Sequence, residues 1–412
     1  MAIRIHKLFI ILTISVMFLT SCNIPLIQQS QGSSGVNADD QTKTMVTLTM
    51  ASMSGSGAQE TPQEPCLEGG DQNSINARLK WGSSKVMLCQ RAVFELTGPV
   101  IINSIRQKIF TEGFPEDDQR AVLRIVSENL TVAIIMRDYD DVVISNVIID
   151  GNRPNLGYKE GEALVAAGGD AKGQVIRSVK ITEPRSWSAL HLMEPCTEAL
   201  IENNEIGPAG MSDRTWADGI SLACTNSIVR NNTIVDATDG AIVVFAATGS
   251  FIENNIIRAE TRTLLGGIHM VESRLLNGNY TGTIVQNNII EAAGAVIRIA
   301  VPMGPRVWLC LDPGETIPTA YGGTVINNIL RGDKMQYGFA ADGVSDWTVL
   351  DNTDESTHIG TPSVDCRGQV ASYPSGFQYY QPRAKGTFQS EFKDAFLELA
   401  LIAIVSPLPG QD

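Results

Sequence analysis

A short motif returns in the same phase along the middle of this 412-residue chain. Each copy has apolar residues on both sides of a polar corner that contains two asparagines. Because one such unit cannot bury its own Val/Ile stripe, the repeat predicts a solenoid whose stacked coils share one core. The clearest copies are ALIENNEI (199–206), SIVRNNTI (227–234), SFIENNII (250–257), TIVQNNII (283–290) and GTVINNIL (323–330).

Two weaker copies precede these, DVVISNVII ending at Ile149 and IRSVKIT ending at Thr182, where Ser178 replaces the asparagine. With the second polar residue as reference, the copies fall at 146, 178, 204, 232, 255, 288 and 328, in steps of 32, 26, 28, 23, 33 and 40. Stacking at this period would align Asn255, Asn288 and Asn328 in an amide ladder. We therefore predict an all-β fold, a right-handed parallel β-helix.

The first residues have the pattern of an export signal. Arg4 and Lys7 precede an apolar run, 8–19, that is too short to span a membrane. The run ends in Leu-Thr-Ser-Cys, which is similar to the bacterial lipobox and predicts lipidation of Cys22. The alternative is a cleaved secretory signal with an incidental cysteine. Residues 22–64 lack periodicity and are rich in Ser, Gly and Gln, as expected of a flexible tether.

The charge of the chain restricts its partners. The net charge is −14, and loss of Arg4 and Lys7 with a signal peptide of residues 1–21 makes it two units more negative. Such a surface repels nucleic acid and anionic membrane. We expect a monomer in the cell envelope that contacts the membrane only through its lipid anchor.

Six cysteines remain after Cys22, an even number in an oxidising compartment. Cys196 and Cys224 are separated by the same step as Asn204 and Asn232, so they fall in one column on adjacent coils, within disulfide range. The alternative is two stacked free thiols. Proximity alone would pair Cys66 with Cys89, and Cys310 with Cys366. The chain has no CxxC and no closely spaced Cys/His pair, so we expect no metal site.

The start of the solenoid carries a family resemblance. Asn73–Trp81 could form a short capping helix, and it is followed by KVMLCQRAVFEL (85–96) and VISNVIIDGNRPN (143–155). This arrangement resembles the start of the pectate-lyase-like superfamily of carbohydrate-active β-helices, which includes pectate lyases and polygalacturonases. The resemblance covers roughly 71–352 and implies the fold rather than a reaction. We expect the β-helix to occupy residues 65–385.

The C-terminal residues 386–412 are expected to form a cap and tail. FQSEFKDAFLELALIAIV (388–405) predicts a helix that covers the open end of the coil stack. A membrane segment is the alternative reading, but this run is too short to span a bilayer.

Function has to be argued from sites, because this fold hosts many activities. One strand recurs before the longer loops, as SALHLME (188–194), DGISLAC (218–224), DGAIVVF (239–245), GGIHMVE (266–272) and AGAVIRIAV (293–301). Alternation with period 2 points its apolar residues inward and His191, Ser221 and His269 outward in one column. Glu194 and Glu272 share a second column at the strand ends. Polar groups gathered on one face predict a binding or catalytic site.

The loops beside this face carry tryptophan and arginine, which suit sugar-ring stacking beside carboxylates. The alternative is that these side chains only cover the bases of the loops. The candidates are Arg185, Trp187, Arg214, Trp216, Arg306 and Trp308.

Asp218 and Asp239 open this strand in adjacent coils. When two carboxylates lie this close, repulsion raises the pKa of one and leaves the other ionised, which is the acid and base arrangement that glycoside hydrolysis requires. In polygalacturonases, Asn-Thr-Asp, Asp-Asp and Gly-His-Gly occur in successive coils of this strand. Asp218 matches the first carboxylate and Asp239 the first of the pair. Gly240 replaces the second aspartate, and Gly266 stands where the histidine is expected, with His269 three residues later. The alternative is that Asp-Gly merely turns the chain into the strand.

A polysaccharide lyase is the chemical alternative. Its β-elimination needs a base, for which Arg214, Arg298 or His269 could serve, and often calcium to neutralise a uronate. Arg298 could also be simply an outward, solvated position. The second class is non-catalytic: a surface lipoprotein that binds or displays glycan, or an adhesive spacer. The sequence favours a polysaccharide-cleaving enzyme, hydrolase ahead of lyase, without a required cofactor unless a lyase uses calcium.

Overall fold

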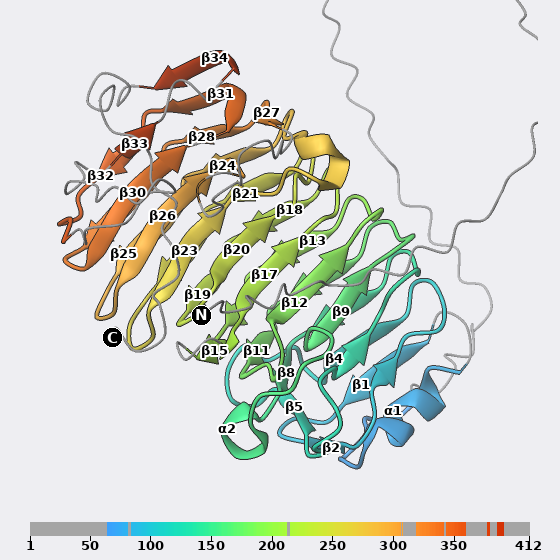
Figure 1. Cartoon of the computed structure of the whole chain (residues 1–412). Helices are drawn as coiled ribbons and strands as arrows, with labels where there is room; N and C mark the ends of the chain where they lie inside the picture. The colour runs from blue at the N-terminus through green and yellow to red at the C-terminus, as the bar shows by residue number, and fades with distance from the viewer. Residues whose placement is uncertain are drawn as a thin grey trace, which may run out of the picture. The chain divides into compact units, whose positions relative to one another are not determined.

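The computed structural model describes residues 64–80, 84–211, 215–305, 307, 319–341 and 343–359, together with the backbone of 377–379 and 385–390. All of them belong to one compact unit, Pro62–Asp412. Within it the chain winds through three stacked parallel sheets, here called A, B and C, and each coil contributes one strand to each sheet (Figure 1). The predicted parallel β-helix is confirmed.

Sheet A contains the strand that precedes each polar corner. In spatial order its strands are β1 (Lys85–Leu88), β4 (Lys108–Thr111), β7 (Val143–Ser145), β10 (Val175–Arg177), β13 (Leu200–Glu202), β18 (Ile228–Arg230), β21 (Phe251–Glu253), β24 (Ile284–Gln286), β28 (Thr324–Ile326), β31 (Val344–Leu350) and β27 (Ala320–Tyr321), with β34 (Lys385–Ser390) also paired to β31.

Sheet B contains the strand that follows each corner. Its strands are β2 (Val93–Leu96), β5 (Ala121–Ile125), β8 (Val147–Asp150), β11 (Lys180–Thr182), β14 (Glu205–Ile206), β19 (Thr233–Val235), β22 (Ile256–Arg258), β25 (Ile289–Ala292), β29 (Ile329–Gly332) and β32 (Thr353–Asp354).

Sheet C contains the recurring strand that carries the predicted site. Its strands are β3 (Val100–Ile101), β6 (Ile134–Ile135), β9 (Val165–Gly168), β12 (Ser188–Met193), β17 (Asp218–Leu222), β20 (Gly240–Val244), β23 (Leu264–His269), β26 (Ile297–Met303), β30 (Met335–Ala341) and β33 (Phe377–Tyr379).

Few other elements interrupt the coils in the part of the chain that the structure describes. Helix α1 (Gln72–Arg78) is the predicted N-terminal cap and is itself capped by Asp71. A four-residue helix, α2 (Arg153–Leu156), and the segment η1 (Leu275–Gly278) lie in loops, and β15 (Gly210–Met211) forms a hairpin with β16 (Thr215–Trp216). No helix among the described residues is long and apolar enough to span a membrane.

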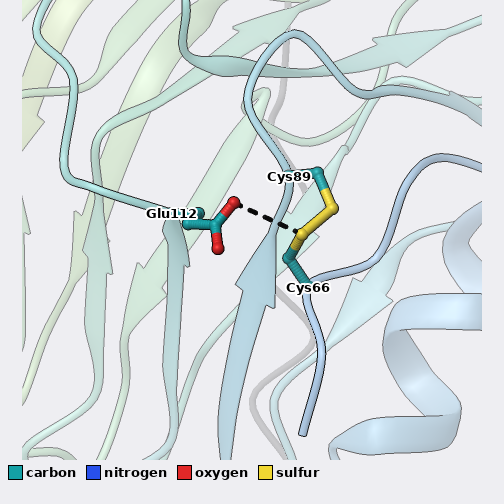
Figure 2. A group of neighbouring side chains, drawn as sticks. All are labelled: Cys66, Cys89 and Glu112. Atoms are coloured by element: carbon teal, nitrogen blue, oxygen red, sulfur yellow. Dashed lines mark hydrogen bonds between the residues drawn. A yellow bond between two sulfur atoms is a disulfide. The ribbon is translucent and has the colours of Figure 1, made fainter.

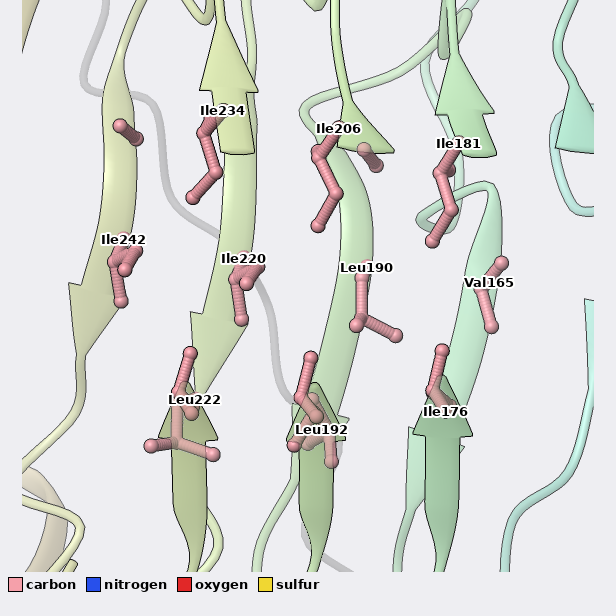
Figure 3. Packing of buried hydrophobic residues seen from close by; sticks show 14 of the residues in the cluster. Val165, Ile176, Ile181, Leu190, Leu192, Ile206, Ile220, Leu222, Ile234 and Ile242 are labelled. Carbon is pink, nitrogen blue, oxygen red and sulfur yellow. The ribbon is translucent and has the colours of Figure 1, made fainter. Parts of the chain in front are cut away.

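The core is built from apolar side chains that repeat at the same height on successive coils. In sheet B, Ile181, Ile206, Ile234, Ile257 and Ile290 follow one another in register, and all are buried. Figure 3 shows the first three of these stacked beside a second row from sheet C. Burial of each such side chain contributes about 1.5–3 kcal/mol, which one coil alone could not obtain.

The polar corner forms the amide ladder that the repeat predicts, and the ladder is longer than expected. Each asparagine except the last donates from Nδ2 to the Oδ1 of the next at 2.8–2.9 Å. Each also donates Nδ2 to a backbone carbonyl, and each Oδ1 accepts a backbone N–H from the neighbouring coil. The members are Asn204, Asn232, Asn255, Asn288, Asn328 and Asn352.

The phase assigned to the two weak copies is wrong by one residue. Ser145 pairs with Arg177, and Arg177 with Glu202, so Asn146 and Ser178 align with Asn203 rather than with Asn204. These corner residues share a left-handed backbone, with φ of 50°, 52° and 56°. Asparagine tolerates that conformation well, which explains the first asparagine of each pair. The second asparagine builds the ladder.

The C-terminal cap also differs from the prediction. The expected helix began at Phe388, but Lys385–Ser390 is strand β34, and Phe388 pairs with Trp347 of β31. The continuation of sheet A explains the difference, because β31 offers an open parallel edge that this segment extends. Residues 391–405 of the expected helix lie outside the described residues.

We predict that Asn255→Ala lowers the free energy of unfolding by about 3 kcal/mol. The substitution removes the acceptor of both the backbone N–H and the side-chain amide of Asn232, which are buried. Asn254→Gly is the matched control, because Asn254 is exposed with φ of 56° and glycine accepts this conformation. Urea denaturation of both variants measures the effect, and equal losses would contradict the ladder's role.

Candidate functional site

The outward face of sheet C carries the predicted polar column. The strand register aligns His191 of β12 with Ser221 of β17, then Val243 of β20, then His269 of β23. Their apolar neighbours Leu190, Ile220 and Ile268 are fully buried on the inner side, as alternation predicts. The column is confirmed, with Val243 between its second and third polar members.

Three outward side chains in this column fold back over the residue three positions earlier. The Ser221 hydroxyl donates to Asp218 Oδ2 at 2.8 Å. A Cβ on Gly240 would lie 2.2 Å from Val243 Cγ2, and a Cβ on Gly266 would lie 1.8 Å from His269 Nε2. The strand therefore does not alternate strictly here, and Asp218 faces outward.

Asp218 is held by defined partners although its side chain is almost fully buried. Its Oδ1 accepts the backbone N–H of Gly240 at 3.0 Å, and its Oδ2 accepts Ser221, whose hydroxyl also lies 2.9 Å from Ser188 Oγ. Burial raises the pKa of Asp218 well above its ordinary value, and the nearby charge of Asp239 raises it further.

Asp239 lies next to Asp218 but one residue out of register with it, because Asp218 aligns with Gly240. Its side chain is half-buried, and burial raises its pKa to about 6. Two adjacent carboxyls that are both shielded from water titrate as a unit, and the first to ionise makes the second harder to ionise. The pair therefore retains a proton at pH values where ordinary aspartates have lost theirs.

His269 closes the other side of this cluster. The position of a Cβ on Gly240 is 3.4 Å from His269 Cγ and 3.4 Å from Asp218 Oδ1, so both side chains flank the same glycine from neighbouring coils. Glycine at 266 leaves the room that the imidazole uses, and glycine at 240 leaves the room that Val243 uses. Burial lowers the pKa of His269 to about 3, so its ring is neutral at ordinary pH.

An aromatic edge lies on the β12 side of the pair. Trp187, which is 39% exposed, precedes β12 and meets the ring of His191 edge-on, with centroids 4.9 Å apart. Its carbonyl accepts the backbone N–H of Asp218 at 2.8 Å, so it stands one coil away from the carboxyls. Burial and the charge of Arg137 lower the pKa of His191 to about 4.

Sequence reasoning missed Arg137 and Glu162, which extend this edge. Arg137 follows β6 and binds Glu162 through two contacts, Nη2 to Oε2 at 2.9 Å and Nη1 to Oε1 at 3.4 Å. They are 25 residues apart on neighbouring coils. Both lie before the clear repeats begin, and only an exact register would have brought them together.

Some predicted substrate-binding residues have structural roles instead. Arg185 is 2% exposed, and its three guanidinium nitrogens donate to the backbone carbonyls of 127, 128, 130, 156 and 157, so a substrate cannot reach it. Burial lowers its pKa. Glu272 aligns with the column of Glu194, as predicted, but its Oε1 accepts the backbone N–H groups of Ser273 and Arg274 and so holds a turn.

The remaining predicted residues are placed in part. Trp216 is half-buried in the β15–β16 hairpin. Arg298 lies half-buried on β26, in register with Leu265 and two coils from Asp239. Arg214, Arg306 and Trp308 lie outside the described residues.

The four cysteines that the structure describes form two disulfides, as predicted. Cys196 is bridged to Cys224, and Cys66 to Cys89. Glu112 Oε2 lies 3.5 Å from Cys66 Sγ, which would form a three-ligand group for a metal if the thiols were free (Figure 2). Because the sulfurs are bonded to each other, they are not thiolate ligands. Cys310 and Cys366 lie outside the described residues.

An open cavity of about 560 Å³ lies away from this site, beside sheet B. It is lined by Glu95, Arg124, Asp150 and residues around α2, and an ion pair of 2.8 Å between Arg124 and Asp150 occupies its polar wall. The acid pair on sheet C is not part of it.

Comparison with solved structures gives similar folds at low identity. An exopolygalacturonase from Thermotoga maritima shares 13% identity over 80% of this chain and 93% of its own, with a TM-score of 0.49. An endo-xylogalacturonan hydrolase from Aspergillus tubingensis shares 13% identity over 77% of this chain and 88% of its own, with a TM-score of 0.47. The Streptococcus pneumoniae surface protein and adhesin PfbA shares 10% identity over 77% of this chain and 91% of its own, with a TM-score of 0.43. Enzymes and an adhesin are therefore both among the similar structures.

A search of curated proteins gave no match. The family model described as the right-handed beta helix region matches residues 133–354, which is more than half of the chain and includes the whole polar column of sheet C. The protein is thus a member of the right-handed β-helix family.

Proposed function

We propose that this protein cleaves a polysaccharide and that it is a glycoside hydrolase whose acid–base pair is Asp218 and Asp239. The observation that supports the proposal is the adjacency of two shielded carboxyls with raised pKa on the outward face of sheet C. A structural turn would not need two such carboxyls, since burial of ionisable groups reduces stability.

The chemistry follows from a shared proton. The protonated carboxyl donates its proton to the glycosidic oxygen as the bond from the anomeric carbon breaks and its electron pair moves to that oxygen. The ionised carboxyl accepts a proton from the water that attacks the anomeric carbon. Asp239 is the more exposed member, which supports its role as the carboxyl that meets the substrate. Asp218 is oriented by Ser221 and the Gly240 N–H.

His269 is proposed as a neutral neighbour of the pair rather than as a charged catalyst. Its imidazole fills the space in front of Gly266, the position at which polygalacturonases carry their histidine. The displacement by three residues in the sequence is therefore much smaller in space. Gly240, where the second aspartate of polygalacturonases would stand, gives no carboxyl, which is why the proposed pair is Asp218 with Asp239.

The activity test uses the chain from residue 23 onward with a panel of neutral and acidic polysaccharides, with and without calcium. We expect new reducing ends without the ultraviolet absorbance of an unsaturated uronate, and we expect Asp239→Asn to lower the rate by about 10²–10⁴-fold. Asp333→Asn, on the exposed loop between β29 and β30, is the control and should keep full activity. Unsaturated products would indicate a lyase, and retention of a glycan without cleavage would indicate a binding protein.

The raised pKa values also predict a loss of stability with rising pH. Between about pH 4 and 6 the folded chain holds a proton on Asp239 that the unfolded chain has released, so the free energy of unfolding falls by on the order of 2–3 kcal/mol across this window. Asp239→Asn should reduce the fall, leaving the part that buried Asp218 contributes, and be more stable than the wild type at pH 7.

Thermal denaturation from pH 3.5 to 8 measures this effect, with Asp333→Asn as the matched carboxyl control. An unchanged pH profile in Asp239→Asn would show that Asp239 ionises as an ordinary surface carboxylate.

We also propose that lipidation of Cys22 holds the enzyme at the cell envelope, on the basis of the lipobox-like Leu-Thr-Ser-Cys. Cys22→Ala should move the protein from the membrane fraction to the soluble fraction and remove the mass of the acyl groups. A membrane-bound Cys22→Ala protein would contradict the anchor.

A further inference from the structure

We propose that the part of sheet C between β6 and β17 binds an uncharged sugar ring, with Trp187 as the stacking platform and the Arg137–Glu162 ion pair as the partner of its hydroxyls. The inference rests on the proposed function and deepens it, because it names the substrate class: a neutral polysaccharide rather than a polyuronate.

The platform is an indole that is both exposed and held in place. Trp187 is 39% exposed, although the residues around it, Ser186 and Ser188, are fully buried. Its edge-on contact with His191, at an interplanar angle of 67°, fixes one side of the ring. Aromatic faces gain from contact with apolar C–H groups, and a pyranose ring presents such a face. The position is one coil from Asp218, so a ring stacked there would be a neighbour of the reacting sugar.

The polar side of this region is the ion pair of Arg137 and Glu162, in which the two opposite charges neutralise each other. The two contacts between Arg137 and Glu162 use both terminal guanidinium nitrogens. Glu162 is about half exposed, with a side-chain exposure of 48%, and offers acceptor positions to hydroxyls. Hydroxyl groups of a sugar can donate to these exposed carboxylate oxygens.

The charge of this region argues against a uronate. A carboxylate ligand needs a cation that is not already neutralised, whereas Arg137 is bound to Glu162. His191 is neutral above about pH 4, and a neutral imidazole offers one donor and one acceptor. The chain itself carries a net charge of −14, which repels polyanions at longer range.

Binding is measured with the chain from residue 23 carrying Asp239→Asn, so that bound polymer is not cleaved. Affinity gel electrophoresis would use xylan, galactan, α-glucan and β-glucan as neutral probes, and polygalacturonate and alginate as anionic ones. We expect retention by at least one neutral polymer and by neither anionic one. Trp187→Ala should weaken that retention about tenfold. Phe251→Ala, an aromatic with 38% exposure on sheet A, is the matched control and should not change it.

A charge variant tests the reason for the selectivity. Glu162→Gln releases the positive charge of Arg137 and should create retention by polygalacturonate or alginate. Glu202→Gln is the control, because it releases Arg230 from a similar 2.8 Å pair on sheet A. A gain in both variants, or in neither, would overturn the inference.

The outcomes separate this inference from the proposed catalysis. Trp187-dependent binding of a neutral polymer that the wild type does not cleave would support the sugar site and count against the hydrolase. Cleavage of polygalacturonate or alginate by the wild type would support catalysis and overturn the neutral-sugar site. Binding of no polymer, or binding unaffected by Trp187→Ala, would overturn the inference as well.

Discussion

The fixed register between successive coils is the constraint on which the rest of this structure depends. Parallel strands about 4.8 Å apart could slide against one another if only apolar side chains held them. The asparagine ladder prevents this, because each amide bonds to the backbone and to the amide of the next coil at one defined position. With the corner fixed, the side chains of all three sheets fall into columns.

Columns bring together residues that are far apart in the chain. Asp218 and His269 belong to coils that are separated by a third coil. Both nevertheless lie beside Gly240 of that middle coil, at the position that a Cβ would occupy. Two glycines make this possible, since a side chain at 266 would fill the space that the imidazole occupies and one at 240 would collide with Val243. The same stacking shields the carboxyls from water. The arrangement that raises the pKa of Asp218 and Asp239 therefore also reduces the stability of the coils that hold them, as is common at catalytic sites.

Much of this architecture could be predicted from the sequence because a repeat reports its own register. The asparagine corners gave the coil boundaries and the Cys196–Cys224 bridge, and the alternation of the recurring strand gave the outward column of His191 and His269. The weak copies at Asn146 and Ser178 were placed one residue out of phase, since a corner without the second asparagine does not say which of its residues has the left-handed backbone.

The chemistry of single side chains was harder to predict. Strict alternation would turn Asp218 toward the core. The strand departs from alternation here, because a Cβ at Gly219 or Gly267 would point into the core, and this departure brings Asp218 outward. Arg185 looked available in the sequence, but the backbone carbonyls that it binds come from two earlier segments, 127–130 and 156–157. The Arg137–Glu162 pair crosses between coils where the repeat is faint. Periodicity contains no information about such contacts.

The central claim is that Asp218 and Asp239 share a proton near neutral pH. Carbon-13 NMR of the side-chain carboxyls in protein labelled at aspartate, titrated from pH 3 to 9 with Asp218→Asn and Asp239→Asn used for assignment, tests it most directly. The account predicts that both resonances titrate above the ordinary aspartate range and that removal of either residue lowers the pKa of the other. Two independent titrations near the ordinary value of about 4 would contradict it.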